Sequence, residues 1–190
     1  MQVIKTEIDD ILIIKNDIFQ DERGYFFESY NKKVFELNNI KNTFVQDNQS
    51  GSTFGVLRGL HYQLEPFAQT KLVRVLKGKV WDVAVDLRKD SPTFGKYVGI
   101  ELSEENRVQL LIPKGFAHGF LVLSQYAEFF YKCDNFYNKE FERGIRFDDP
   151  DIGIKWPLSK EQLILSEKDK RLPFLKNAEI TFRWSKEWIF

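Results

Sequence analysis

The chain contains only two histidines, and one of them, His61, lies close in sequence to two cationic residues, Arg58 and Lys71. Histidine titrates near neutral pH and is the usual base for moving a proton, whereas Arg and Lys bind anions or stabilise developing negative charge. Three uses fit this combination: a proton-transfer site, an anion-binding site or a solvated strand edge. A hydrogen-bonded structural role is the more common one for a lone strand histidine, so the other residues must decide.

Lys71 and Tyr131 each fall on the apolar side of an expected strand. Lys71 alternates with Val73, and an ammonium that faces the interior of a barrel is costly without an anion beside it. Tyr131 alternates with Phe129, so its hydroxyl also needs a partner. A lysine that reaches solvent is an equally good explanation, and a buried structural tyrosine is the more common one. The functional alternative is a phenol that acts as an acid across a cavity from a histidine base.

The second histidine, His118, belongs to "IPKGFAHGF", which has the P-x-G-x-x-H spacing of the second motif of cupin barrels. A metal-binding cupin also needs an H-x-H pair and a glutamate upstream, and "GLHYQ" supplies a single histidine. Cys133 is the only cysteine, which excludes a disulfide within the chain and a cysteine-based zinc site. The motif therefore predicts a cupin-type barrel without a metal.

Asp169 has two possible roles. With Ser166 it forms an S-x-x-D pattern that is typical of a helix start, and capping alone explains both residues. The alternative is a carboxylate that binds one nitrogen of a histidine, orients the ring and stabilises its protonated form. The pattern by itself favours the cap.

Two polar stretches nearer the N-terminus suit the recognition of a nucleotide. "FQDERGYFFESY" contains Arg23 and Glu28, and "QDNQS" contains Gln46 and Asn48. Arginine binds phosphate through two parallel hydrogen bonds, and side-chain amides bind the edges of a base or a sugar. Turn formation is the simpler explanation for each stretch in isolation.

The elements that must position these residues are mostly strands. Alternating apolar runs punctuated by Gly and Pro cover residues 70–135, and the pair Lys77–Gly78 predicts a β-hairpin turn between the first two runs. Short helices are expected only at the flanks, at 31–39 with Asn31 as the cap and within 159–173 with two serine starts. The pattern predicts an all-β barrel with short flanking helices, in a single domain over residues 1–190.

Composition excludes several classes of function. Lys plus Arg and Asp plus Glu both number 28, so there is no overall basic field for nucleic acid or an anionic membrane. The apolar runs are too short to span a bilayer, and the charged beginning of the chain is unlike a signal peptide. We therefore expect a cytoplasmic protein that binds neither nucleic acid nor membrane.

Taken together, the motifs resemble one family. "FQDERGYFFESY", "QDNQS", "GVLRGLHYQ", "KLVRVLKGKVWDVAVDLRKDSPTFG", "IPKGFAHGFLVLS", "EFFYKCDNFY" and "DDPDIGIKWP" are similar, in order and spacing, to the successive signatures of dTDP-4-dehydrorhamnose 3,5-epimerases. The resemblance covers about residues 1–175 and leaves out the last segment, "EITFRWSKEWIF". It implies a jelly-roll barrel, usually a homodimer with an exchanged N-terminal segment, with no metal or organic cofactor and a dTDP-4-keto-6-deoxyhexose as substrate.

The resemblance also assigns roles. His61 is the base, supported by Asp169, which reverses the preference for a simple cap; Tyr131 is the acid on the opposite face, and Lys71 stabilises the enolate at O4. Tyr137 stacks on the thymine. Substrate contacts are implied at nine positions: Arg23, Glu28, Gln46, Asn48, Arg58, His118, Tyr137, Glu142 and Lys168.

Three rival interpretations remain. A related epimerase acting at one carbon, or on another nucleotide sugar such as a GDP-linked heptose, needs the same acid, base and lysine. A ketoisomerase on this barrel normally has more histidines than two. A non-catalytic sugar-binding barrel has no need of an acid opposite a base.

Overall fold

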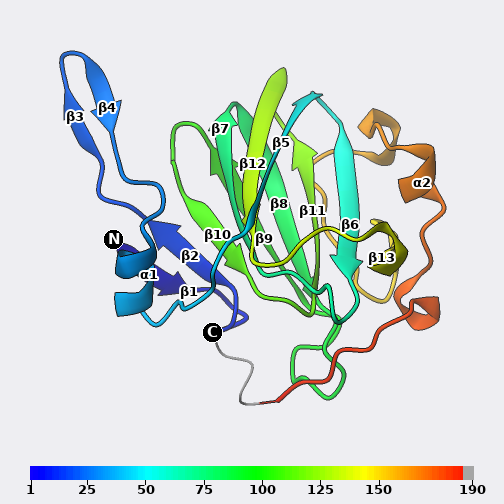
Figure 1. The fold of residues 1–190 in the computed structure, drawn as a ribbon. Helices are drawn as coiled ribbons and strands as arrows, with labels where there is room; N and C mark the ends of the chain where they lie inside the picture. Colours follow the sequence, from blue (N-terminus) through cyan, green and yellow to red (C-terminus); the bar gives the residue numbers. More distant parts are fainter. Residues whose placement is uncertain (186–190) are drawn as a thin grey trace.

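The computed structural model describes residues 1–185, which form two antiparallel sheets facing each other (Figure 1). One sheet has the strand order β1-β2-β10-β7-β12-β5 and the other β13-β6-β11-β8-β9, while β3 and β4 form a separate ribbon. Strands far apart in sequence are neighbours in both sheets, as in a jelly roll. The prediction of an all-β jelly-roll barrel is confirmed.

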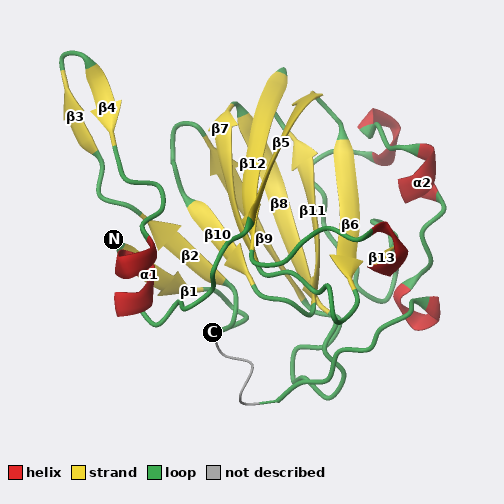
Figure 2. Cartoon of the chain, viewed as in Figure 1, coloured by secondary structure: helices red, strands yellow, loops and turns green. Residues whose placement is uncertain are grey.

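The strands have the following bounds: β1 Gln2–Lys5, β2 Leu12–Lys15, β3 Phe19–Asp21, β4 Gly24–Phe26, β5 Gln46–Thr53, β6 Leu57–Gln63, β7 Lys71–Lys77, β8 Lys79–Asp86, β9 Tyr97–Ser103, β10 Gln109–Ile112, β11 Phe116–Val122, β12 Tyr126–Cys133 and β13 Glu142–Gly144. The helices are short: α1 Lys32–Leu37, α2 Glu167–Lys170 and the 3₁₀ turns η1 Lys139–Phe141, η2 Lys160–Gln162 and η3 Leu175–Asn177. They lie at the periphery of the sheets (Figure 2). Each is too short to cross a bilayer within the described part of the chain.

The main core lies between the two sheets. Val73 and Val75 of β7, Ala84 of β8, Phe120 of β11 and Phe129 of β12 belong to one buried cluster. The rings of Phe120 and Phe129 stack with centroids 4.0 Å apart. Alternation decides which face each strand turns inward, because successive side chains point to opposite faces of a sheet.

The prediction of a hairpin at Lys77–Gly78 is wrong. Strand β7 pairs with β10 and β12, whereas β8 pairs with β11 and β9 in the other sheet. The turn is therefore a corner at which the chain passes from one sheet to the other. Gly78 has φ 76°, and a Cβ there would lie 2.1 Å from the Tyr126 carbonyl oxygen, so only glycine fits.

A second apolar cluster covers the outer face of the five-stranded sheet and includes the C-terminal segment. Ile180 and Phe182 are buried against Val83 and Val85 of β8. The backbone of Lys89 bonds to Phe182 and Trp184, which fixes this segment beside the sheet. The segment beyond the sequence signature is thus part of the packed structure as far as residue 185.

The predicted helix starts are confirmed. The side chain of Asn31 accepts hydrogen bonds from the backbone of Lys33 and Val34 at the start of α1. Ser159 begins η2, and Ser166 caps α2 by accepting from the backbone N–H of Asp169 at 3.0 Å. Helix α2 matters for function because it carries Asp169 toward β6.

Candidate active site

A cavity of about 580 Å³ lies between the sheets, with β5, β7 and β12 on one side and β6 and β11 on the other. The segment around α2 forms part of its wall. The volume is within the usual range for small-molecule sites, about 300–1,000 Å³. Eight residues predicted from the sequence line it: Asn48, Arg58, His61, Lys71, His118, Tyr131, Lys168 and Asp169.

His61 and Asp169 form a close pair, although they are 108 residues apart in sequence. The Nε2 atom of His61 lies 2.7 Å from Oδ1 of Asp169, and the backbone N–H of Gly59 donates to Oδ2 at 3.3 Å. Burial alone would raise the pKa of the Asp169 carboxyl, but the bonds from His61, Gly59 and Ser166 lower it overall. An ionised Asp169 accepts the Nε2 proton, so Nδ1 of His61 is the nitrogen left free to act as a base.

Asp169 therefore does more than cap a helix. Its backbone N–H completes the cap with Ser166, while its carboxylate is turned toward His61. The two roles coexist because one uses the backbone and the other the side chain. The expectation of a simple cap is corrected by this geometry.

Lys71 and Tyr131 lie close together on the opposite sheet. Nζ of Lys71 is 5.7 Å from the centroid of the Tyr131 ring. Burial lowers the pKa of the Lys71 ammonium, opposed by Cys133, Asp82 and Glu142, so an anion in the cavity would favour its charged form. Burial raises the pKa of Tyr131 to about 12, which keeps the phenol protonated and able to donate at neutral pH.

The second histidine makes a second contact with a carboxylate. Nε2 of His118 lies 2.9 Å from Oδ2 of Asp82, and the ring is almost fully buried. His118 stands opposite His61 in the β11–β6 register, so both imidazoles reach the same cavity. Burial lowers the pKa of His118; Asp82 opposes this effect, and Lys71 and His61 add to it.

Three further predicted residues lie beside the cavity and bond to residues there. Tyr137 donates its hydroxyl to Glu142 at 2.9 Å, and Lys168 forms an ion pair with the same carboxylate at 2.5 Å. Gln46 accepts from the backbone of Tyr137 and donates to Asn48. Burial would raise the pKa of Glu142, but the hydrogen bonds from Lys168 and Tyr137 lower it overall. The ionised Glu142 carboxylate therefore links the side chains of Lys168 and Tyr137.

Arg23 and Glu28 are not brought to this cavity. Arg23 lies on the β3–β4 ribbon, which projects away from the sheets, and its guanidinium pairs with Asp21 (Figure 1). Glu28 lies between the ribbon and α1 and does not line the cavity. Neither side chain lies at the cavity of its own chain, and contact of Arg23 and Glu28 with a nucleotide stays a prediction, including at the site of a second copy.

Two residues that hold side chains of the site in position were not predicted from the sequence. Ser52 on β5 accepts a bond from Nε of Arg58 at 3.0 Å and so fixes the direction of the guanidinium. Asp82 sits at alternate spacing with Ala84 and Asp86, a pattern that resembles a solvated strand face. It could have been recognised only by knowing that β8 is covered on both faces, because then its carboxylate must be buried.

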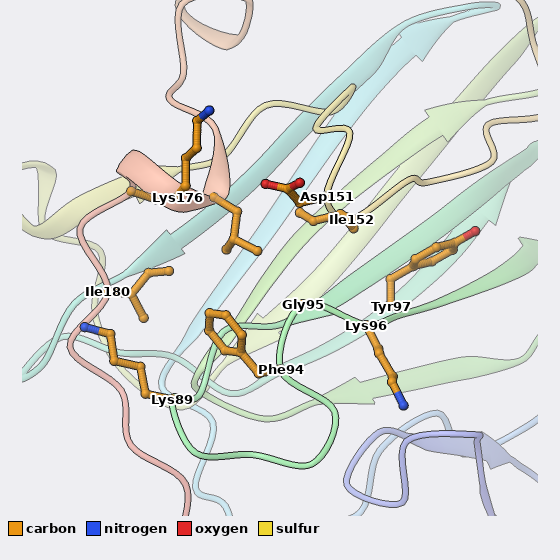
Figure 3. A pocket seen from close by; sticks show the side chains of 11 residues that line it. Lys89, Phe94, Gly95, Lys96, Tyr97, Asp151, Ile152, Lys176 and Ile180 are labelled. Carbon is orange, nitrogen blue, oxygen red and sulfur yellow. The ribbon is translucent and has the colours of Figure 1, made fainter.

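A larger hollow, about 810 Å³, lies away from these residues beside β9 and the C-terminal segment (Figure 3). Its three lysines point in different directions and do not converge on one point. It is lined by Lys89, Phe94, Gly95, Lys96, Tyr97, Asp151, Ile152, Leu175, Lys176, Ala178 and Ile180. Within residues 1–185 there is also no cluster of three or more His, Cys, Asp or Glu that could hold a metal ion.

A β-barrel whose cavity is lined by a carboxylate-bound histidine, a protonated tyrosine and a partly buried lysine has the fold and the groups of a proton-transferring, cupin-like enzyme. A profile described as dTDP-4-dehydrorhamnose 3,5-epimerase matches residues 5–177, and this chain belongs to that family.

Relatives and solved structures agree with this family. A dTDP-4-dehydrorhamnose 3,5-epimerase from Shigella flexneri is 62% identical over 170 residues, which is 89% of this chain and 93% of the relative. A structure from Legionella pneumophila, in complex with dTDP-4-keto-L-rhamnose, has a TM-score of 0.93 and 50% identity over 97% of this chain and 98% of that one. A structure from Elizabethkingia anophelis has a TM-score of 0.89 and 55% identity over 93% and 97%.

Proposed function

We propose that this chain is a dTDP-4-dehydrorhamnose 3,5-epimerase that converts dTDP-4-dehydro-6-deoxy-D-glucose to dTDP-4-dehydro-L-rhamnose. The proposal rests on one observation, which is that a single cavity is lined by His61, Asp169, Lys71 and Tyr131. The relatives named above support the choice of reaction.

In the proposed reaction, the C4 ketone acidifies the hydrogens on C3 and C5. Nδ1 of His61 takes one of these protons, and the electron pair of the broken C–H bond moves into an enolate whose charge lies on O4. Lys71 stabilises that oxygen, as donors do in an oxyanion hole. Asp169 stabilises the imidazolium that forms. Tyr131 then donates its proton to the other face of the carbon, which inverts the centre.

Binding of the nucleotide is proposed for the outer part of the same cavity. Arg58 and Lys168 supply positive charge for a diphosphate, and Asn48 and Gln46 supply amides. Tyr137 is half-exposed and tied to Glu142, so its ring face is available for stacking on a base. No metal or organic cofactor is needed for this proton transfer.

We also propose a homodimer in which the N-terminal segment of one copy completes the site of the other. The β3–β4 ribbon exposes Phe19, Tyr25 and Phe26, and it carries Arg23 away from the cavity of its own chain. A ribbon of this kind is more stable when its apolar side chains are covered. A cytoplasmic location is proposed as well, since Cys133, the lone cysteine, is a buried free thiol.

A second candidate is epimerisation at C3 alone. A 3'-monoepimerase from Streptomyces bikiniensis in complex with dTDP-quinovose has a TM-score of 0.84 and 30% identity to this chain. The same acid, base and lysine would serve both reactions, so the product must be identified.

A coupled assay tests the proposed function. The chain is incubated with dTDP-4-dehydro-6-deoxy-D-glucose, NADPH and a reductase that accepts only dTDP-4-dehydro-L-rhamnose. We expect NADPH oxidation that requires this chain and is absent with the His61→Ala variant. A lack of oxidation with the wild-type chain, while its fold is intact by circular dichroism, would contradict the 3,5-epimerase function.

A further inference from the structure

Asp82 is a buried carboxylate in an otherwise apolar part of the barrel. Val80 and Ala84, its neighbours on the same face of β8, belong to the core between the sheets. Its side chain is fully buried. Placing a carboxylate there is costly unless it is paired, so a reason for its presence must lie in its contacts.

One carboxylate oxygen of Asp82 is used and the other is not. Oδ2 lies 2.9 Å from Nε2 of His118. Oδ1 is buried and has no hydrogen-bond partner among residues 1–185. The pair is therefore not a fully satisfied structural network of the kind formed by Asp86, whose carboxylate accepts from Arg88, Ser91 and Thr93.

The contact decides which nitrogen of His118 carries its proton. A carboxylate accepts, so the proton lies on Nε2, and Nδ1 of the neutral ring keeps its lone pair. His118 lines the cavity, and none of residues 1–185 donates a hydrogen bond to that nitrogen. Nδ1 is thus an unused acceptor at the site where the sugar would bind.

Protonation of Nδ1 as well is disfavoured by the surroundings. Lys71 and His61 lie close enough to repel a positive charge on His118, and burial acts in the same direction. The Asp82 carboxylate is the group that opposes them. The two histidines of the cavity also differ in their surroundings. His61 is more exposed, and its carboxylate partner comes from α2 rather than from the barrel core. We therefore expect the two histidines to have different roles.

We propose that Asp82 is a positioning residue that fixes His118 as a neutral hydrogen-bond acceptor, with Nδ1 directed at a hydroxyl of the hexose next to the ketone. This inference rests on the proposed function for the identity of the sugar. In this arrangement Lys71 binds the ketone oxygen and His118 binds the adjacent hydroxyl. Together these two contacts fix how the sugar ring is rotated above His61. A stability role alone does not account for Asp82, because one of its two buried carboxylate oxygens has no hydrogen-bond partner among residues 1–185.

The first test reads the tautomer directly. The chain has only two histidines, so a ¹⁵N–¹H spectrum of the imidazoles contains two spin systems, and a His118→Gln variant assigns them. We expect His118 in the wild-type protein at neutral pH to be protonated at Nε2 only. A proton on Nδ1, either alone or in an imidazolium, would overturn the proposal. This measurement needs no turnover and is therefore independent of the proposed function.

The second test compares two substitutions at the same position. Asp82→Asn keeps an oxygen that can accept from Nε2, whereas Asp82→Leu removes it at similar volume. We expect the leucine variant to lose about 10–100-fold in kcat/KM, the range found for outer partners that orient metal-bound histidines, and the asparagine variant to lose less. The leucine variant should also show a mixture of His118 tautomers.

Two controls separate positioning from distortion. Asp86→Asn changes a buried aspartate on the same strand and should leave the His118 spectrum and kcat/KM unchanged at temperatures where it is folded. dTDP, which lacks the sugar, should bind the wild-type protein and Asp82→Leu equally in calorimetry. The positioning role would be overturned if the kcat/KM of Asp82→Leu stayed within twofold of the wild-type value. It would also be overturned if the affinity of this variant for dTDP fell by the same factor as its kcat/KM. A wild-type protein without turnover would overturn only the proposed function.

Discussion

Replacing Asp169 by asparagine removes the charge beside the proposed base and leaves the size of the side chain almost unchanged. When His61 has taken a proton, its imidazolium faces the Asp169 carboxylate across 2.7 Å. At an effective dielectric constant of about 20, this attraction amounts to about 6 kcal/mol. The His61 side chain is 29% exposed, so solvent screens part of it. A remaining loss of about 4 kcal/mol corresponds to a decrease of about 10³-fold in kcat.

The expected loss is about tenfold smaller than that for the orienting aspartate of serine proteases, whose change to asparagine lowers kcat by about 10⁴-fold. The assay is the coupled reductase measurement, with thermal unfolding followed in parallel. Glu167→Gln is the matched control, because Glu167 lies on the same helix and pairs with Lys170 outside the cavity. A loss smaller than tenfold for Asp169→Asn, or an equal loss for Glu167→Gln, would refute the role assigned to the carboxylate.

Three further changes give distinct outcomes. Tyr131→Phe should still exchange substrate protons with solvent while inversion falls by about 10²-fold or more, as NMR of the product would reveal; equal loss of exchange and inversion would assign Tyr131 to binding instead. Glu142→Gln weakens the hydrogen bond that holds Tyr137, so KM should rise about tenfold with kcat nearly unchanged. An unaltered KM in steady-state kinetics would contradict a role of Glu142 in positioning Tyr137 for binding. Asp86→Asn should lower the free energy of unfolding by about 3–5 kcal/mol in denaturant titrations near neutral pH. Burial raises the pKa of Asp86, but its hydrogen bonds lower it overall, so its stabilisation is present above the unfolded pKa of about 3.9 and is lost as the pH falls through the lower folded value. Wild type and variant should therefore converge in stability in acid; a gap that stays constant with pH would argue against an ionised Asp86.

The strands were predictable because alternation and turn residues are local signals. The runs at 97–103 and 127–137 correspond to β9 and β12 within a few residues. The corner at Lys77–Gly78 was not predictable in the same way. A glycine turn between two alternating runs suits a hairpin and a change of sheet equally well, and only the pairing of distant strands decides between them.

Residue type and strand parity were enough to propose the acid, the base and the lysine. They could not show that these side chains lie in one cavity. His61 and Asp169 are joined through the position of α2 against β6, which no local pattern encodes. Asp82 was missed for the opposite reason. Its alternation resembles a solvated face, and the burial of both faces of β8 is a property of the whole barrel.

Solvent deuterium incorporation shows directly whether His61 removes protons from C3 and C5. The chain is incubated with dTDP-4-dehydro-6-deoxy-D-glucose in D₂O, and the sugar is examined by NMR, with His61→Ala as the control. We expect deuterium at both C3 and C5 of a dTDP-4-dehydro-L-rhamnose product and none with the variant. Deuterium at C3 alone would make the chain a 3-epimerase, and wild-type levels of exchange in His61→Ala would contradict the assignment of His61 as the base.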